Sequence, residues 1–128
     1  MTIEIFTVCD YAQPFGGSVN ILNPFEALRV KELPISRSFS IVVRLRYEPE
    51  EKPASIKLRL INPGNKDMIP PVTNNDVLET NKVRTSCINH VIAFENMSFL
   101  MFGRYMVVIE SDGHNYNLPF YVEKVEDD

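Results

Sequence analysis

The stretch FSIVVRLRY, residues 39–47, decides the fold of this chain. Alternate side chains of this stretch are apolar and share one face of a predicted strand: Phe39, Ile41, Val43, Leu45 and Tyr47. Ser40, Arg44 and Arg46 point the other way, and Val42 is the only apolar residue among them. A period of two residues predicts a β-strand with one face on a core and the other face on water.

Similar alternation recurs along the chain, and prolines and glycines separate the alternating runs. Further strands are expected at residues 2–9, from 19 onward, and at 55–61, 82–94, 106–110 and 115–122. The parity of the run 82–94 changes between Cys87 and Ile88, and a β-bulge would account for that change. Asp112-Gly113 marks a hairpin turn. About seven strands at this spacing predict an all-β, antiparallel β-sandwich, immunoglobulin-like or C2-like.

Length and composition limit the possible functions. A chain of 128 residues suits one domain, which we place at residues 1–123 with an acidic tail at 124–128. The net charge of −4 provides no basic field for nucleic acid. No apolar run is long enough to cross a bilayer, and the N-terminus has no basic region typical of a signal peptide. We therefore expect a cytoplasmic protein that binds neither nucleic acid nor membrane.

The residues that carry most enzyme chemistry are few. Cys9 and Cys87 lie far apart in sequence, and each sits in an apolar stretch, so we expect two buried, reduced thiols. His90 and His114 lack the spacing to other ligands that a zinc site needs. Aspartates in the predicted loops are expected to cap turns and not to bind calcium: Asp10, Asp67, Asp76 and Asp112. The sequence predicts no enzyme, cofactor or metal.

Two local features bear on the type of sandwich. Asn23-Pro24-Phe25-Glu26 has the residues of a helix start, yet a strand with a bulge at Pro24 fits residues 24–32 as well. The strand is favoured, and both alternatives stay open. Tyr105 follows a glycine at the start of a late strand, which resembles a tyrosine corner, whose hydroxyl binds upstream backbone.

One cluster of charges suggests a site. If residues 38–48 and 55–61 form a hairpin in which Glu48 pairs with Ser55, four cations lie on its outward face: Arg44, Arg46, Lys57 and Arg59. Like charges directly opposed on a sheet are destabilising, so anionic groups are expected among them. Acids of a neighbouring strand are the favoured source: Glu4, Glu95 or Glu110. An acidic patch of a partner or an anionic ligand is the alternative.

A second candidate is apolar. Phe94 and the run Phe99-Leu100-Met101-Phe102 contain few neighbouring charges. Such a stretch is either core or a contact patch on the surface, and core is favoured.

Several segments resemble a family of small bacterial proteins that carry a domain of unknown function. The resembling segments are FTVCDYA at 6–12, NIL at 20–22, VVRLRY at 42–47, FGRY at 102–105 and DG at 112–113. The chain departs from the family at Asn23-Pro24, where a glycine-rich turn before Phe25 is expected. The resemblance implies a single cytoplasmic-type β-sandwich domain, and it implies no activity, cofactor or catalytic residue.

These observations favour a non-enzymatic domain that acts as a protein-interaction or structural module. Its partner would be a protein, either a second copy or another chain, and sandwich edges are natural sites for strand addition. The alternative is a module that binds a small anionic ligand on the face of Arg44, Arg46, Lys57 and Arg59.

Overall fold

The computed structural model describes residues 1–15, 18–48, 50–51, 55–73, 79–82, 87–111 and 113–126, with the backbone alone for 79–82. The described residues contain ten strands: β1 Thr2–Phe15, β2 Ser18–Pro24, β3 Ala27–Val30, β4 Ile35–Arg46, β5 Ile56–Ile61, β6 Val72–Thr73, β7 Glu79–Lys82, β8 Cys87–Phe99, β9 Gly103–Ser111 and β10 His114–Lys124. No described helix is long and apolar enough to cross a membrane.

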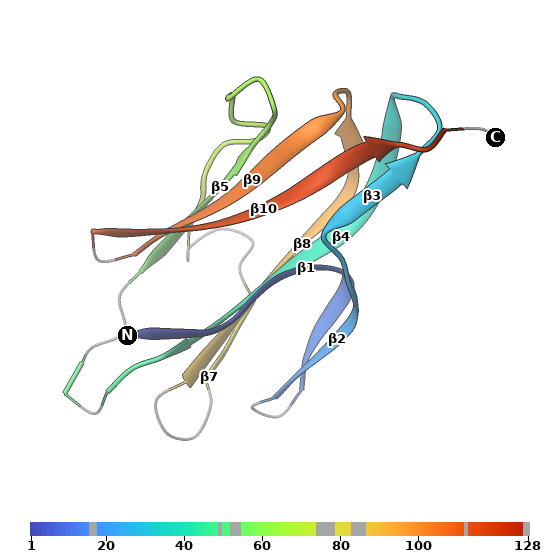
Figure 1. Cartoon of the computed structure of the whole chain (residues 1–128). Coiled ribbons are helices and arrows are strands. Elements are labelled where there is room, and N and C mark those ends of the chain that lie inside the picture. Colours follow the sequence, from blue (N-terminus) through green and yellow to red (C-terminus); the bar gives the residue numbers. More distant parts are fainter. Residues whose placement is uncertain are drawn as a thin grey trace.

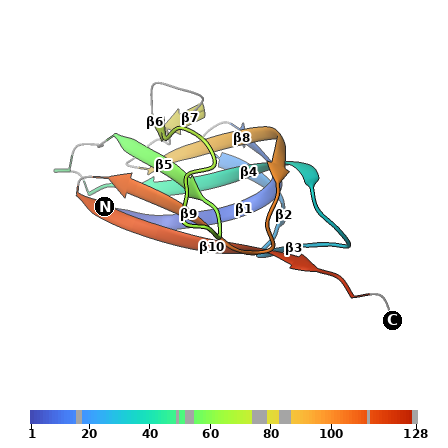
Figure 2. The same cartoon turned by 90° about the horizontal axis from the view of Figure 1, so that it is seen from above.

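The strands form two sheets of five that stack as a β-sandwich (Figure 1). Sheet A has the order β2-β1-β4-β8-β7, and sheet B has the order β3-β10-β9-β5-β6. Figure 2 shows sheet B lying over sheet A. The predicted all-β sandwich is confirmed. One pairing departs from the antiparallel prediction, because β3 runs parallel to β10.

The inner face of β4 forms the core, as its alternation predicts. Phe39, Ile41, Val43 and Leu45 are almost fully buried against the inward side chains of sheet B. Aromatic rings join the two sheets: the rings of Phe39 and Phe120 lie 6.1 Å apart. Tyr105 is buried beside them, and its hydroxyl donates a hydrogen bond of 2.8 Å to the carbonyl of Met101, as the sequence predicts.

The segment that was open between helix and strand is extended. Strand β2 ends at Pro24, and Asn23 adopts a positive φ of 52°. Strand β3 follows after Phe25 and Glu26. The amide of Tyr121 in β10 donates to the carbonyl of Glu26, so pairing with β10 outweighs the local helix signal.

The predicted strand 82–94 is wrong in its bounds. Residue 82 ends β7, residues 83–86 lie outside the described part, and β8 continues to Phe99. The register irregularity of β8 lies further along, opposite the step from Arg37 to Phe39. Cys87 and Ile88 look like a change of parity because both faces of β8 are buried there. Asp112 also lies outside the described residues, although Ser111 and His114 pair across that connection.

Strand β1 is longer than predicted, because it continues past Asp10 to Phe15. Its second half and β2 form a hairpin that turns away from sheet B (Figure 1). Strand β1 contacts β8 and β7 although β4 lies between them in the sheet. The hairpin therefore folds over the outer face of sheet A. A second core results, made of Cys9, Ala12, Val42 and Val91 with Ile5, Val19 and Ile21 packed against it.

The end of the chain is paired further than predicted. Strand β10 includes Lys124, and the amide of Val125 donates to the carbonyl of Val30. Residues 127–128 of the predicted tail lie outside the described part.

Candidate functional site

The predicted face of four cations does not form. Strand β4 pairs with β1 and β8 in sheet A, whereas β5 pairs with β9 and β6 in sheet B. Both edges of β4 are occupied, so the chain crosses to the other sheet before β5. The predicted hairpin of residues 38–48 and 55–61 is therefore wrong, and Arg44 and Arg46 lie on a different sheet from Lys57 and Arg59.

Glu4 on β1 neutralises the first pair of cations. The Arg44 Nε lies 3.1 Å from Glu4 Oε1, and the Arg46 guanidinium contacts the other carboxylate oxygen. The Cys87 thiol donates to Glu4 Oε1 at 3.4 Å. Partial burial opposes ionisation of Glu4, but the Cys87 hydrogen bond and the two guanidinium groups outweigh it and lower the pKa of this carboxyl.

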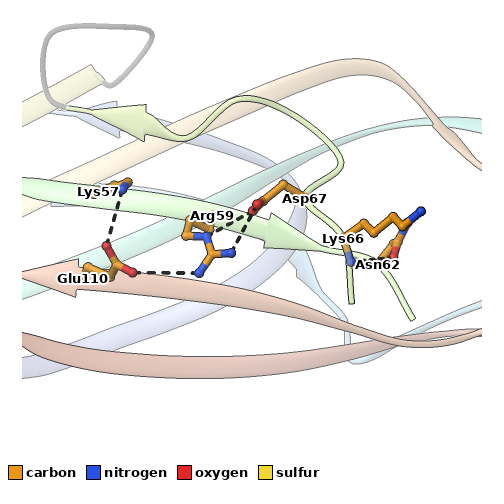
Figure 3. Close-up of polar contacts among 6 residues, drawn as sticks. All are labelled: Lys57, Arg59, Asn62, Lys66, Asp67 and Glu110. Atoms are coloured by element: carbon orange, nitrogen blue, oxygen red, sulfur yellow. Dashed lines mark hydrogen bonds and ion pairs between the residues drawn. The ribbon is translucent and has the colours of Figure 1, made fainter. Parts of the chain in front are cut away.

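Asp67 and Glu110 neutralise the second pair (Figure 3). Arg59 donates from Nε and Nη2 to the two oxygens of Asp67, at 3.1 and 3.2 Å. Glu110 lies directly opposite Lys57 on β9, and its carboxylate is 3.8 Å from Lys57 Nζ. Glu4 and Glu110 were two of the expected acids, and Glu95 forms none of these pairs. The Glu4 and Glu110 pairs confirm the favoured prediction of acids from a neighbouring strand. Asp67, which was expected to cap a turn, lies after β5 and is a further partner of Arg59.

The thiols and the buried histidine are packed inside. Both cysteines are free and buried. Burial raises the pKa of the Cys9 thiol to about 11, so this thiol stays protonated. His90 lies directly opposite Val43 of the main core, so it shares the inner face of sheet A, and burial lowers its pKa to about 4. Among the described residues no three side chains are placed to hold a metal ion.

Asp10 anchors the hairpin to the sandwich. Its Oδ1 accepts a hydrogen bond of 2.7 Å from Arg37, and its Oδ2 accepts one of 2.6 Å from Asn23. These bonds, from Asn23 first and Arg37 second, lower the pKa of the carboxyl. Of the four loop aspartates, Asp67 is held by Arg59, while Asp76 and Asp112 lie outside the described residues.

The predicted apolar stretch divides into core and surface. Phe94 and Phe99 are buried, as favoured. Leu100, Met101 and Phe102 are exposed in the connection from β8 to β9, where core was expected. The chain reverses there between two strands of different sheets, so these side chains extend beyond the end of the core.

A second exposed apolar set lies on the hairpin of β1 and β2. Tyr11 is 55% exposed, Phe15 is 69% exposed and Leu22 is 64% exposed. Tyr11 and Leu22 are directly paired across the two strands. The sequence contains a signal for this surface that alternation alone does not reveal: residues 11–22 include no charged side chain.

The four sheet edges of the described structure differ in their protection. Strand β3 has four residues including Arg29, β6 has two residues, and the four residues of β7 include Glu79 and Lys82. Strand β2 has seven residues and no charge. Short length, charge and proline are among the usual devices that keep sheet edges from pairing with other chains. The one proline of β2 is its last residue, Pro24, so residues 18–23 have none of these devices. We call β2 with Tyr11 and Phe15 the contact edge.

A family model matches residues 4–123, which run from β1 into β10. The chain belongs to DUF6941, a family of unknown function. This confirms the resemblance to a family that carries a domain of unknown function. No curated protein matches the chain. The DUF6941 match spans nearly the whole sandwich, including the contact edge.

The outer face of sheet B in this DUF6941 chain carries a shallow groove of about 530 Å³. Its polar lining includes Arg104 and the amides of Asn62, Asn65 and Asn117, and Met106 contributes an apolar wall. Among the described residues that line it there is neither a thiol nor a carboxylate. The described lining therefore offers no thiol as a nucleophile and no carboxylate as a general acid or base.

Proposed function

We propose that this DUF6941 chain is a non-enzymatic module of the bacterial cytoplasm that binds protein through the contact edge. The observation that carries the proposal is the contrast between β2 and the other three edges. An edge strand without charge offers backbone donors and acceptors to a strand of another chain. Three large apolar side chains beside it add area that a partner would remove from water.

The chemistry of the described residues supports contact over catalysis. The Cys9 thiol is protonated and enclosed, and the buried His90 ring is neutral at pH 7. The predicted cations are already paired with carboxylates of the same chain, as Arg44 is with Glu4 and Arg59 is with Asp67. Two free, buried thiols also suit a reducing compartment.

Within the sandwiches, we place the fold nearer to the immunoglobulin-like type than to the C2-like type. The hydrogen bond from Tyr105 to the backbone four residues upstream is the feature that supports this choice. The C2-like type is less favoured because Asp10 and Asp67 are engaged by arginines and not grouped at one end as calcium ligands.

The anion-binding alternative has lost its physical argument. It required four uncompensated cations on one face, and the two pairs lie on different sheets beside their own acids. If Arg44, Arg46, Lys57 and Arg59 did bind a small anion, phosphate or citrate would raise the melting temperature by mass action.

The proposal is tested by capture from cells that contain the protein at its native level. We compare the wild type with a Tyr11→Ser/Leu22→Ser variant, and use Leu100→Ser/Met101→Ser as a control of matched exposure at the other apolar site. A protein that is captured by the wild type and the control, but not by the contact-edge variant, is the expected result. Equal capture by all three, or no specific capture and no self-association, contradicts the proposal.

A further inference from the structure

We propose that the occupant of the contact edge is a second copy of this chain, with the two β2 strands paired antiparallel about a two-fold axis at Asn20. This inference rests on the proposed function and names its partner. Among the described residues no strand pairs with the outer edge of β2. A two-fold axis through Asn20 would join the two copies of sheet A into one continuous sheet.

The sequence of β2 is self-complementary about Asn20. On the face toward the second core, Val19 of one copy would lie opposite Ile21 of the other, and the reverse pair is identical by symmetry. Pairs of β-branched side chains are favourable across antiparallel strands. On the exposed face the two Asn20 amides would lie opposite each other, and amides can donate and accept at once.

The exposed face also matches its own copy. In this register Leu22 lies opposite Ser18 of the second copy, and Ser18 pairs with Phe15 within its own hairpin. Tyr11 pairs with Leu22 on the other side. These pairs place four side chains in one row across β1 and β2 of one copy and β2 and β1 of the other. The row contains Tyr11 and Leu22 of the first copy, then Ser18 and Phe15 of the second copy. The small serine between two large side chains lets Leu22 and the partner's Phe15 approach, and symmetry repeats the row.

The distribution of charge favours a second copy over a charged partner. The chain carries a net charge of −4, so two copies repel each other, but only weakly. Residues 11–22 carry none of that charge. Two identical neutral strands meet without like charges opposed. An antiparallel second copy at β3 with its axis at Arg29 would oppose two arginines.

A charge-swap experiment tests the register. We measure the dimer dissociation constant by sedimentation equilibrium for the wild type, for Asn20→Lys, for Asn20→Asp and for an equimolar mixture of the two variants. The wild type is expected to show twice the monomer mass of 14.7 kDa as its concentration rises. Each variant alone opposes like charges at the axis and weakens the dimer by about fivefold or more. The mixture opposes unlike charges and restores association.

Gln13→Lys is the matched control. Gln13 is exposed on the same face and pairs with Asn20 within the hairpin. Its distance to its symmetry mate would be three strand spacings, about 14 Å, which exceeds the Debye length of about 8 Å at physiological salt. This variant should associate within about twofold of the wild type. Circular dichroism confirms that each variant is folded.

The outcomes separate the two proposals. A wild type that stays monomeric, or a mixture that associates no better than its components, overturns pairing at Asn20. If the wild type is monomeric while Tyr11→Ser/Leu22→Ser loses a different cellular protein, the contact edge stands and the second copy does not. If neither association is found, both proposals fail.

Discussion

The outer faces of the two sheets both come from alternating strands, but they differ in their exposure to solvent. On sheet B the charged outward side chains of β5 and β9 reach solvent and form ion pairs, such as Lys57 with Glu110. On sheet A the outward side chains Val42 and Cys9 are fully buried, because the hairpin of β1 and β2 folds over them. An alternating strand therefore predicts which face meets the main core, but not whether the opposite face stays in water.

The covering hairpin also explains the exposed apolar surface. Its inward residues Ala12, Val19 and Ile21 form the second core. Its outward residues Tyr11 and Leu22 have no such cover among the described residues. The hairpin buries its inward apolar face within the chain. We assign its exposed face, which combines three large apolar side chains with uncharged polar ones, and its open edge to a partner.

The largest expected effect comes from placing a charge on each outer face. Val42→Lys buries an ammonium beneath the hairpin and should lower the free energy of unfolding by more than about 3 kcal/mol, or prevent folding. Met106→Lys on sheet B should change it by about 1 kcal/mol or less, because Met106 lines the open groove and a lysine can extend its head into water. Urea unfolding measures both. Equal losses would show that the hairpin does not cover sheet A.

The second effect is a dependence of stability on pH that comes from His90 on the inner face of β8. His90 points to the main core, and burial lowers its pKa from 6.5 to about 4. Between these values the unfolded chain binds a proton that the folded chain excludes, so stability falls as pH decreases. The free energy of unfolding should drop by about 2–3 kcal/mol from pH 7 to pH 4.5.

A variant assigns that loss to the histidine. His90→Gln cannot titrate and should show a flatter profile across the same range. Asp10, whose pKa is lowered, contributes a loss of the same sign only at lower pH, below the ordinary value of 3.8 for its carboxyl. A variant with the same pH dependence as the wild type would contradict a neutral, buried His90.

A smaller effect compares neighbouring residues of β2. Ile21→Ala removes a half-buried side chain from the second core and should cost about 1–2 kcal/mol. Leu22→Ala, one residue on, removes an exposed side chain and should cost about 0.5 kcal/mol or less at concentrations where the protein is monomeric. The ratio is read from urea unfolding curves. A larger cost at Leu22 would mean that the faces of the hairpin are assigned in reverse.

The smallest effect belongs to the solvated face. Asp67→Asn removes the carboxylate that Arg59 holds with two hydrogen bonds. Because both side chains are at least a third exposed and are screened by salt, the melting temperature should fall by no more than about 2 °C, and less at high salt. A large fall that is independent of salt would show that this surface is more than a set of solvated ion pairs.

The sequence predicts the sandwich because alternation is local. Phe39 to Leu45 identify the inner face of β4 without any knowledge of its neighbours, and Tyr105 identifies its own hydrogen bond. Val42 is the one apolar residue on the outer face of β4. Its apolar character is explained only by the structure, in which the hairpin of β1 and β2 covers it.

Strand pairing is less predictable because it depends on the whole chain. Nothing in residues 38–61 reveals that β1 and β8 occupy both edges of β4, so the adjacent runs look like a hairpin. The four cations then look as if they share a face. In the structure Arg44 pairs with Glu4 of β1 and Lys57 pairs with Glu110 of β9, and both of these strands are distant in sequence from their partners. The contact edge is not predicted for the same reason. Which strand lies at the edge of a sheet is known only when the pairing of all its strands is known.

The most direct measurement is disulfide trapping at the proposed two-fold axis. In an antiparallel pair directly opposed Cα atoms lie about 4.5–5.5 Å apart, which a disulfide can bridge. Under mild oxidation, Asn20→Cys should form a covalent dimer, whereas Gln13→Cys should not, and the buried Cys9 and Cys87 should leave the wild type monomeric on a denaturing gel. Equal cross-linking of both variants, or none at Asn20→Cys, would contradict pairing of β2 with a second copy.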